Sequence, residues 1–136
     1  MRMVCLMNHR LLEEQKENAR AELGVREFVA PPGEISGLWS RVNPHADLEE
    51  LGTGRIISWI EHVSGSGDFV LVQGDYALTF AVADWCLSTG RRPVHATTER
   101  NAVEKREGGV TVVKREFRHV KFREYERFAK KQINKA

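Results

Sequence analysis

Polar residues that could bind or act on a phosphate follow three apolar runs of this chain. They are Asn8-His9-Arg10 after the run Met1 to Met7, Gln73-Gly74-Asp75-Tyr76 after Phe69 to Val72, and Thr97-Thr98-Glu99-Arg100 after Arg92 to Ala96. If these runs are parallel strands, their carboxyl ends meet at one edge of a sheet, which is where open α/β sheets bind ligands. We therefore expect the three segments to form one site.

Two of these segments are suited to an anion. Thr97 and Thr98 can each donate a hydrogen bond, and Arg100 offers a planar fork that matches phosphate oxygens. Gly74 would let a ligand approach the backbone amides at the start of the next helix, where the N–H groups and the helix dipole favour negative charge. The alternative for Thr97 to Arg100 is an ordinary strand end with a surface arginine.

Three side chains are candidates for moving a proton: Asp75, His9 and His119. Asp75 could accept a proton or bind a ribose hydroxyl, or it could simply cap the following helix. His9 has the right unperturbed pKa for acid–base work, although a histidine after a strand can also be a neighbour of a helix cap. His119 alternates with apolar residues and could instead be a half-buried structural histidine.

The remaining candidate ligand-binding residues are polar or aromatic neighbours of these positions. Asn8 could orient a phosphate or ribose, or cap the first helix, and Gln73 and Tyr76 flank the Gly74-Asp75 pair. Arg123 lies close to Tyr125, so the two could neutralise and stack on a nucleotide. The sequence shows no Ser-His-Asp order, no paired-cysteine motif and no clustered carboxylates, and we expect neither a metal nor a cofactor.

The elements that would position these residues alternate between strands and helices. We expect strands over 1–7, 25–30, 69–72 and 92–96. We expect helices over 11–23, 47–63 and 76–87, the last of them largely buried, and a helical turn over 35–42. This alternation predicts an α/β fold with a Rossmann-like, mostly parallel sheet flanked by helices. Runs 110–113 and 117–122 predict a C-terminal strand or antiparallel hairpin after a turn at Glu107-Gly108-Gly109. A short basic helix or frayed tail, Tyr125 to Ile133, follows.

Composition limits the class of protein. A chain of 136 residues suits one domain, which we expect over 1–136, and no run is long enough to span a membrane or to form a signal peptide. Cys5 and Cys86 fall in apolar segments as free thiols would, which favours a reducing, cytoplasmic location. Residues 114–136 carry nine Lys or Arg against three Glu, so this segment suits a phosphate-bearing ligand or nucleic acid, or is a solvated helix end.

The quoted segments resemble a family of small stand-alone CRISPR-associated proteins of type III systems. The resemblance is carried by Asn8-His9, by Phe69 to Gln73 leading into Gly74-Asp75-Tyr76, by Ala96 to Arg100, and by Phe117 to Arg123. That family is related to the CARF (CRISPR-associated Rossmann fold) proteins, and its members act as ring nucleases. The resemblance spans almost the whole chain.

The resemblance implies a homodimer that binds cyclic oligoadenylate, with cyclic tetra-adenylate the expected ring, and linearises it to end an antiviral signal. Such a metal-independent phosphodiesterase would use the ribose 2′-hydroxyl as nucleophile, and we expect neither DNA nor a membrane as a partner. Two alternatives stay open: a sensor or sink that binds the ring without cutting it, and an RNA-binding or adaptor module that uses the basic C-terminal segment.

Overall fold

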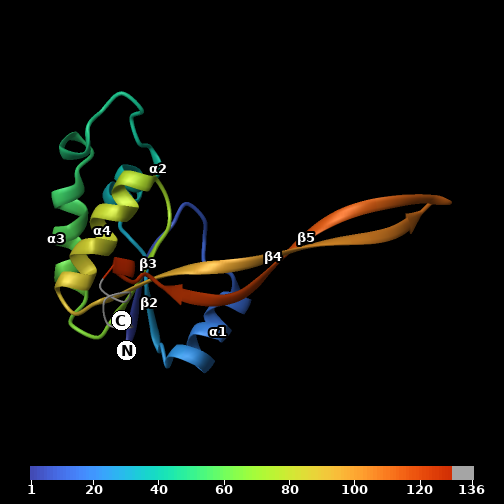
Figure 1. The fold of residues 1–136 in the computed structure, drawn as a ribbon, viewed down its shortest axis with the longest axis horizontal. Helices are drawn as coiled ribbons and strands as arrows, with labels where there is room; N and C mark the ends of the chain where they lie inside the picture. Colours follow the sequence, from blue (N-terminus) through green and yellow to red (C-terminus); the bar gives the residue numbers. More distant parts are fainter. Residues whose placement is uncertain (130–136) are drawn as a thin grey trace.

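The sheet of this protein has five strands in the order β2-β1-β3-β4-β5. The computed structural model describes residues 1–129 (Figure 1). Strands β1 (Arg2–Leu6), β2 (Glu27–Val29), β3 (Phe69–Val72) and β4 (Arg92–Glu107) run parallel, and β5 (Val110–Glu124) is antiparallel to β4. The predicted α/β class, with a mostly parallel sheet and an antiparallel C-terminal strand, is confirmed.

The two faces of the sheet pack against different elements. Helices α2 (Gly33–Ser40), α3 (Thr53–Val63) and α4 (Tyr76–Ser88) cover one face, where Val70 and Val72 of β3 are buried. Helix α1 (Glu13–Leu23) and Phe122 of β5 cover the other face, where Phe69 and Leu71 are buried. All four residues of β3 are therefore inside, as expected of a parallel strand with helices on both sides.

Two of the helix predictions are corrected by the structure. The helix expected over 47–63 is divided into a 3₁₀ turn (Leu48–Glu50) and α3, because Gly52 between them adopts a left-handed φ of 72°. Helix α4 is less buried than its apolar sequence suggested. One side of it is in the core, but Tyr76 and Phe80 are 94% and 77% exposed.

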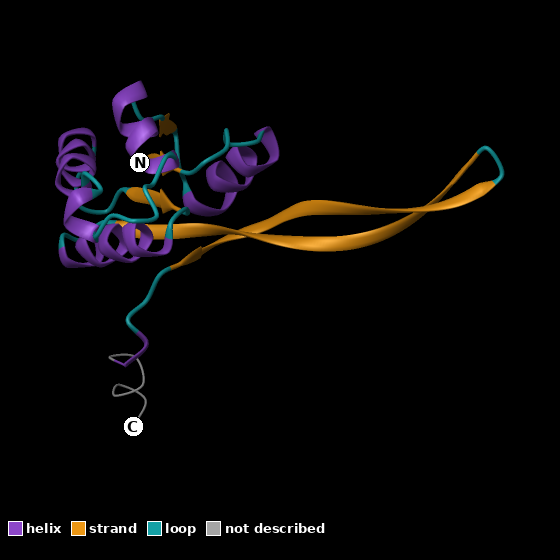
Figure 2. Ribbon diagram, turned by 90° about the horizontal axis from the view of Figure 1, so that it is seen from above, coloured by secondary structure: helices purple, strands orange, loops and turns teal. Residues whose placement is uncertain are grey.

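The main departure from the sequence prediction is the length of β4 and β5. The fourth strand was expected to end at Ala96, but β4 continues to Glu107 and pairs with β5 in one long hairpin that projects from the body (Figures 1 and 2). The predicted turn is present, with Glu107 paired to Val110. Gly108 and Gly109 both have positive φ, as a two-residue hairpin turn of this kind requires.

The basic C-terminal tail lies mostly outside the described residues. The segment from Tyr125 to Ile133 was expected to be a short helix or a frayed tail; among its described residues, 125–127 have no regular secondary structure and 128–129 are helical, and Lys130, Lys131 and Lys135 lie outside the described residues. None of the helices within residues 1–129 has the length and apolar character to cross a membrane.

Candidate functional site

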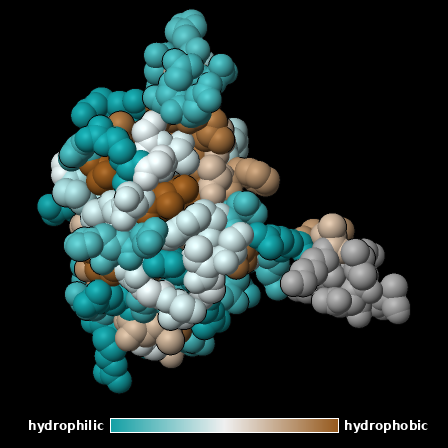
Figure 3. Space-filling model, turned by 90° about the vertical axis from the view of Figure 1, so that its left-hand side faces the viewer, coloured by the Kyte–Doolittle hydropathy of each residue, from teal (hydrophilic) through white to brown (hydrophobic). Residues whose placement is uncertain are grey.

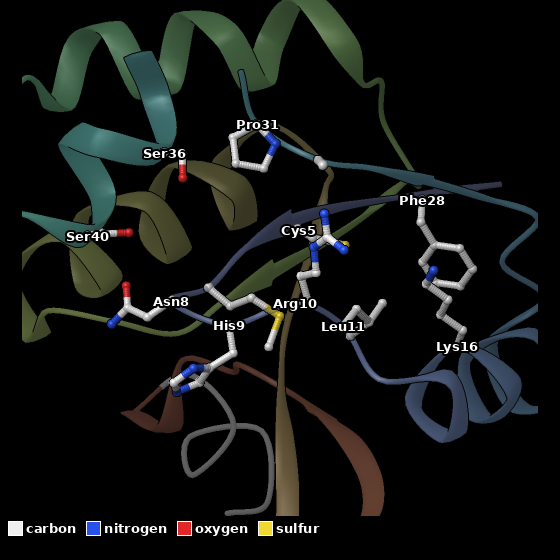
Figure 4. Close-up of a pocket in the computed structure, with 12 residues that line it drawn as sticks. Cys5, Asn8, His9, Arg10, Leu11, Lys16, Phe28, Pro31, Ser36 and Ser40 are labelled. Carbon is white, nitrogen blue, oxygen red and sulfur yellow. The ribbon is translucent and has the colours of Figure 1, made fainter. Parts of the chain in front are cut away.

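A cavity of about 580 Å³ opens at the carboxyl ends of β1 and β2, between α1 and α2 (Figure 4). Its size is within the usual range of small-ligand sites, roughly 300–1,000 Å³. Three segments supply its polar side chains, which are Asn8, His9 and Arg10 after β1, Lys16 of α1, and Ser36 and Ser40 of α2. The predicted binding edge of the sheet therefore contains a pocket, formed around the segment that follows β1.

The charge of this cavity is positive. Arg10 and Lys16 are its charged lining residues, and no carboxylate lines it. Figure 4 shows Arg10 reaching toward Phe28 and Pro31, whereas the His9 ring is directed the other way. The Lys16 ammonium lies 6.0 Å from the centre of the Phe28 ring, so a cation and an aromatic surface are close together. Such a wall can bind an anionic group and an adjoining flat ring.

Sequence reasoning missed half of this pocket. Ser36 and Ser40 are four residues apart on α2 and so share one helix face, which is the one signal that could have identified them. Lys16 and Phe28 had no such signal. They reach the cavity because α1 lies across the sheet with Lys16 over the ring of Phe28 in β2.

The Gly74 backbone is packed against a side chain rather than open to a ligand. A Cβ at this position would lie 2.7 Å from Nε1 of Trp39, whose indole is 1% exposed. The same Nε1 donates a hydrogen bond to the Gln73 carbonyl oxygen at 3.1 Å. Gln73 is engaged through its side chain as well, because its Oε1 accepts from the Ala96 N–H at 2.8 Å. Contrary to the expectation for a ligand cradle, Trp39 occupies the space that the glycine leaves.

Asp75 is the N-cap of α4. Its Oδ2 accepts hydrogen bonds from the backbone N–H groups of Ala77 and Leu78, at 3.0 and 3.1 Å. The capping alternative considered from the sequence is thus realised, and Tyr76 beside it points into solvent.

The segment Thr97 to Arg100 is part of a continuous strand, so the expectation that it ends a strand at the rim is wrong. A register irregularity lies between Ala96 and Thr98. There the Thr97 hydroxyl donates to the Lys121 carbonyl oxygen at 2.9 Å and accepts from the Lys121 N–H at 3.2 Å. Thr98 is exposed on β4. Arg100 lies further out on the hairpin, where its guanidinium is 5.4 Å from the centre of the Phe117 ring.

His119 packs against α1. Its Nε2 is 2.8 Å from Oδ1 of Asn18, its backbone N–H donates to Glu14 at 2.8 Å, and its ring lies 4.8 Å from that of Phe122. The Nδ1 atom is buried with no hydrogen-bond partner among the described residues. Burial lowers the pKa of His119, because a second ring proton there would be charged and unsolvated.

Arg123 and Tyr125 lie at the base of β5. Arg123 is exposed and pairs with His95 across the strands. The Tyr125 hydroxyl donates to the Val72 carbonyl oxygen at 2.6 Å, so this tyrosine anchors the end of β5 against β3. Its ring is 5.1 Å from that of His95.

The cysteines offer no activated thiol. Burial raises the pKa of both Cys5 and Cys86 to about 12, so neither is a thiolate near neutral pH. Within residues 1–129, no group of three or more His, Cys, Asp or Glu side chains is placed to hold a metal ion.

Comparison with known proteins yields one family. Residues 1–123 match the family described as "Uncharacterized protein MJ1673 family". A curated relative, "Uncharacterized protein MJ1673" from Methanocaldococcus jannaschii, is 32% identical over 124 residues, covering 91% of this chain and 96% of its own. No solved structure matches the chain.

Proposed function

The chain belongs to the MJ1673 family, and we propose that it binds a phosphate-bearing nucleotide ligand in the cavity at the ends of β1 and β2. The observation that carries this proposal is a cavity with two cationic side chains, Arg10 and Lys16, and no carboxylate in its wall. Phosphate oxygens would accept from Arg10, Lys16 and the hydroxyls of Ser36 and Ser40. Phe28 provides a flat apolar surface for a base.

We further propose that the ligand is cyclic oligoadenylate, with cyclic tetra-adenylate the expected ring, and that the protein linearises it. The support for this step is the sequence resemblance to the ring nucleases of type III CRISPR systems. In the reaction, a ribose 2′-oxygen attacks the adjoining phosphorus in line, loses its proton, and displaces the 5′-oxygen. The 5′-oxygen takes up a proton, and the product is a linear chain with a 2′,3′-cyclic phosphate.

In this reaction the protein forms no covalent intermediate. It positions the 2′-oxygen and the phosphorus in line and stabilises the negative charge on the phosphate. Arg10 and Lys16 would neutralise the additional negative charge on the phosphorus centre, and positioned groups of this kind supply much of the rate of phosphoryl chemistry. His9 also lines the cavity, and its role as acid–base group requires its ring to turn toward Arg10 from the direction shown in Figure 4. Asp75 and His119 are already engaged, in a helix cap and against α1.

The test is to incubate the pure chain with cyclic tetra-adenylate, with and without EDTA, and to resolve the products by chromatography. We expect a linear product with a 2′,3′-cyclic phosphate in both samples. Binding without a product would instead support the sensor or sink alternative, and absence of binding would refute the proposal.

Substitutions of residues that line the cavity test whether binding and cleavage take place there. Arg10→Gln and Lys16→Gln should each weaken ligand binding by about tenfold or more, the usual loss for a charge-assisted contact. Arg26→Gln is the matched control, because Arg26 directly precedes β2, at the amino end of this strand, whereas the cavity lies at its carboxyl end. His9→Ala should leave affinity nearly unchanged and slow single-turnover cleavage about 10²-fold or more.

A further inference from the structure

The outer part of the β4–β5 hairpin, residues 99–118, is a two-stranded ribbon with no protein packed on either face. None of its side chains is buried, and only Val103 and Val112 are partly covered. In Figures 1 and 2 this arm runs away from the body, and its tip lies far from the helices. Figure 3 views the body from the end opposite to the arm, and that end is broad by comparison. The arm is therefore the slender part of the structure within residues 1–129.

The register of the hairpin sorts the side chains of the arm onto two faces. Residues that lie opposite each other on paired strands share a face, and successive residues of one strand alternate between the faces. Arg100 lies opposite Phe117, and Arg106 lies opposite Thr111. We call their side of the ribbon the arginine face, and its charged and large apolar residues are Arg100, Glu104, Arg106, Val113, Arg115 and Phe117.

The opposite face of the arm neutralises its own charge. Within residues 99–118 it carries three Lys or Arg against three Glu. The Lys105 ammonium lies 3.8 Å from the Glu116 carboxylate, and the Lys114 ammonium lies 3.1 Å from the Glu107 carboxylate. Both partly covered valines of the arm also belong to this face. The opposite face therefore needs no partner to balance its charge.

The arginine face is positively charged and has no such pairs. It carries three Arg against one Glu, a net charge of +2. Arg100, Arg106 and Arg115 are exposed, and among residues 1–129 none of them forms an ion pair or a hydrogen bond. The Arg100 guanidinium lies 5.4 Å from the centre of the Phe117 ring, and Phe117 is 63% exposed. Guanidinium groups match phosphate oxygens and stack on flat rings, so this face suits a nucleic acid.

The shape of the arm favours duplex DNA among nucleic acids. The major groove of B-form DNA, about 12 Å wide and about 8.5 Å deep, admits a two-stranded β-ribbon. The major groove of an RNA duplex is too narrow and deep for side chains to read. Arg100 and Arg106 are six residues apart, which at about 3.4 Å per residue is roughly 20 Å, or about six base pairs of DNA. The arm is therefore long enough to follow such a groove.

We propose that the arm enters the major groove of duplex DNA with its arginine face toward the DNA. The three guanidinium groups bind phosphates, and Val113 and Phe117 make apolar contact with the base edges, where thymine presents a methyl group. We expected no DNA partner from the sequence, where the pairing that gathers these arginines on one face is not visible. The proposal rests on the arm alone and does not depend on the ligand of the cavity.

The test is fluorescence anisotropy of a labelled duplex of about 20 base pairs, or two helical turns, titrated with the full chain at several salt concentrations. Three phosphate contacts release counterions, so the logarithm of the association constant should fall against the logarithm of the salt concentration with a slope of about −2.7. Affinity should therefore drop about 40-fold between about 50 and 200 mM salt.

Substitutions on the two faces of the arm locate the contact. Arg100→Gln, Arg106→Gln and Arg115→Gln should each weaken binding about eightfold at about 0.1 M salt and reduce the magnitude of the slope by about 0.9. Lys105→Gln and Lys114→Gln are the matched controls, because both lysines lie on the opposite face of the same arm. They should keep the wild-type slope and an affinity within about twofold of wild type. All five side chains are exposed, so circular dichroism should show the wild-type fold for each variant.

Glu104→Gln removes the carboxylate of the arginine face, so it should tighten DNA binding. The proposal is overturned if the wild-type chain does not bind duplex DNA at about 50 mM salt. It is also overturned if the arginine variants keep the wild-type affinity, which would place the DNA elsewhere, including on the basic segment beyond residue 129. Equal or tighter binding of duplex RNA, of single-stranded DNA or of poly-glutamate would overturn it as well, because none of these offers a B-form groove.

Discussion

Replacing Gly74 with alanine tests whether this glycine serves Trp39 or a ligand. The added Cβ would lie 2.7, 3.0 and 3.1 Å from three ring atoms of Trp39. The indole is 1% exposed and its Nε1 donates a hydrogen bond to the Gln73 carbonyl oxygen. The ring therefore cannot move aside without losing this bond and its packing. Forcing an extra carbon into such a site costs about 1–3 kcal/mol, and the rigid neighbour places Gly74→Ala at the upper end. The expected loss is about 2–3 kcal/mol.

The assay is thermal unfolding followed by circular dichroism. For a chain of this length, about 2–3 kcal/mol corresponds to a fall in melting temperature of roughly 6–12 °C. Gly33→Ala is the control, because nothing lies within 4 Å of its Cβ position and the residue begins a helix. That variant should melt at or slightly above the wild-type temperature.

A double-mutant cycle identifies Trp39 as the cause. Trp39→Phe removes Nε1 and its hydrogen bond, so it destabilises by itself. It also removes the atom nearest to the new Cβ, and the double variant should therefore be less destabilised than the sum of the two single changes, by about 1 kcal/mol. The reasoning is refuted if Gly74→Ala melts within about 1 °C of wild type while ligand affinity falls, since the glycine would then serve the ligand.

The remaining predictions concern residues that make structural contacts away from the cavity. Asp75→Asn should leave the melting temperature nearly unchanged because Asn caps as well as Asp, whereas Asp75→Ala should cost about 1 kcal/mol in thermal unfolding. Thr97→Val should cost about 1 kcal/mol in urea unfolding, because both backbone groups of the exposed Lys121 lose their partner, and Thr97→Ser should restore most of it. Burial lowers the pKa of His95 and of His119, so the unfolded chain binds more protons than the folded one. Stability should therefore fall as the pH drops below about 6.5, and His119→Gln should reduce this slope in melting temperature against pH.

The local sequence predicts which elements form, because periodicity and turn chemistry are local properties. Four apolar residues from Phe69 to Val72 could be recognised as a buried strand, and Gly24 and Gly108-Gly109 as a helix stop and a turn. The edge of the sheet that bears the cavity could also be predicted, since parallel strands place their carboxyl ends together.

Only the tertiary structure decided which polar residues meet at that edge. Nothing in the residues near Ala96 indicates that β4 continues for eleven more, because the mostly polar, exposed stretch from Thr97 to Glu107 has no strand pattern of its own and is stabilised by its pairing with β5. That pairing carries Arg100 out of the expected site. Lys16 and Phe28 enter the cavity through the packing of α1 across the sheet, and Trp39 fills the space at Gly74 through a contact 35 residues apart. Contacts between distant segments depend on how the helices pack on the sheet, and local sequence patterns do not predict this packing.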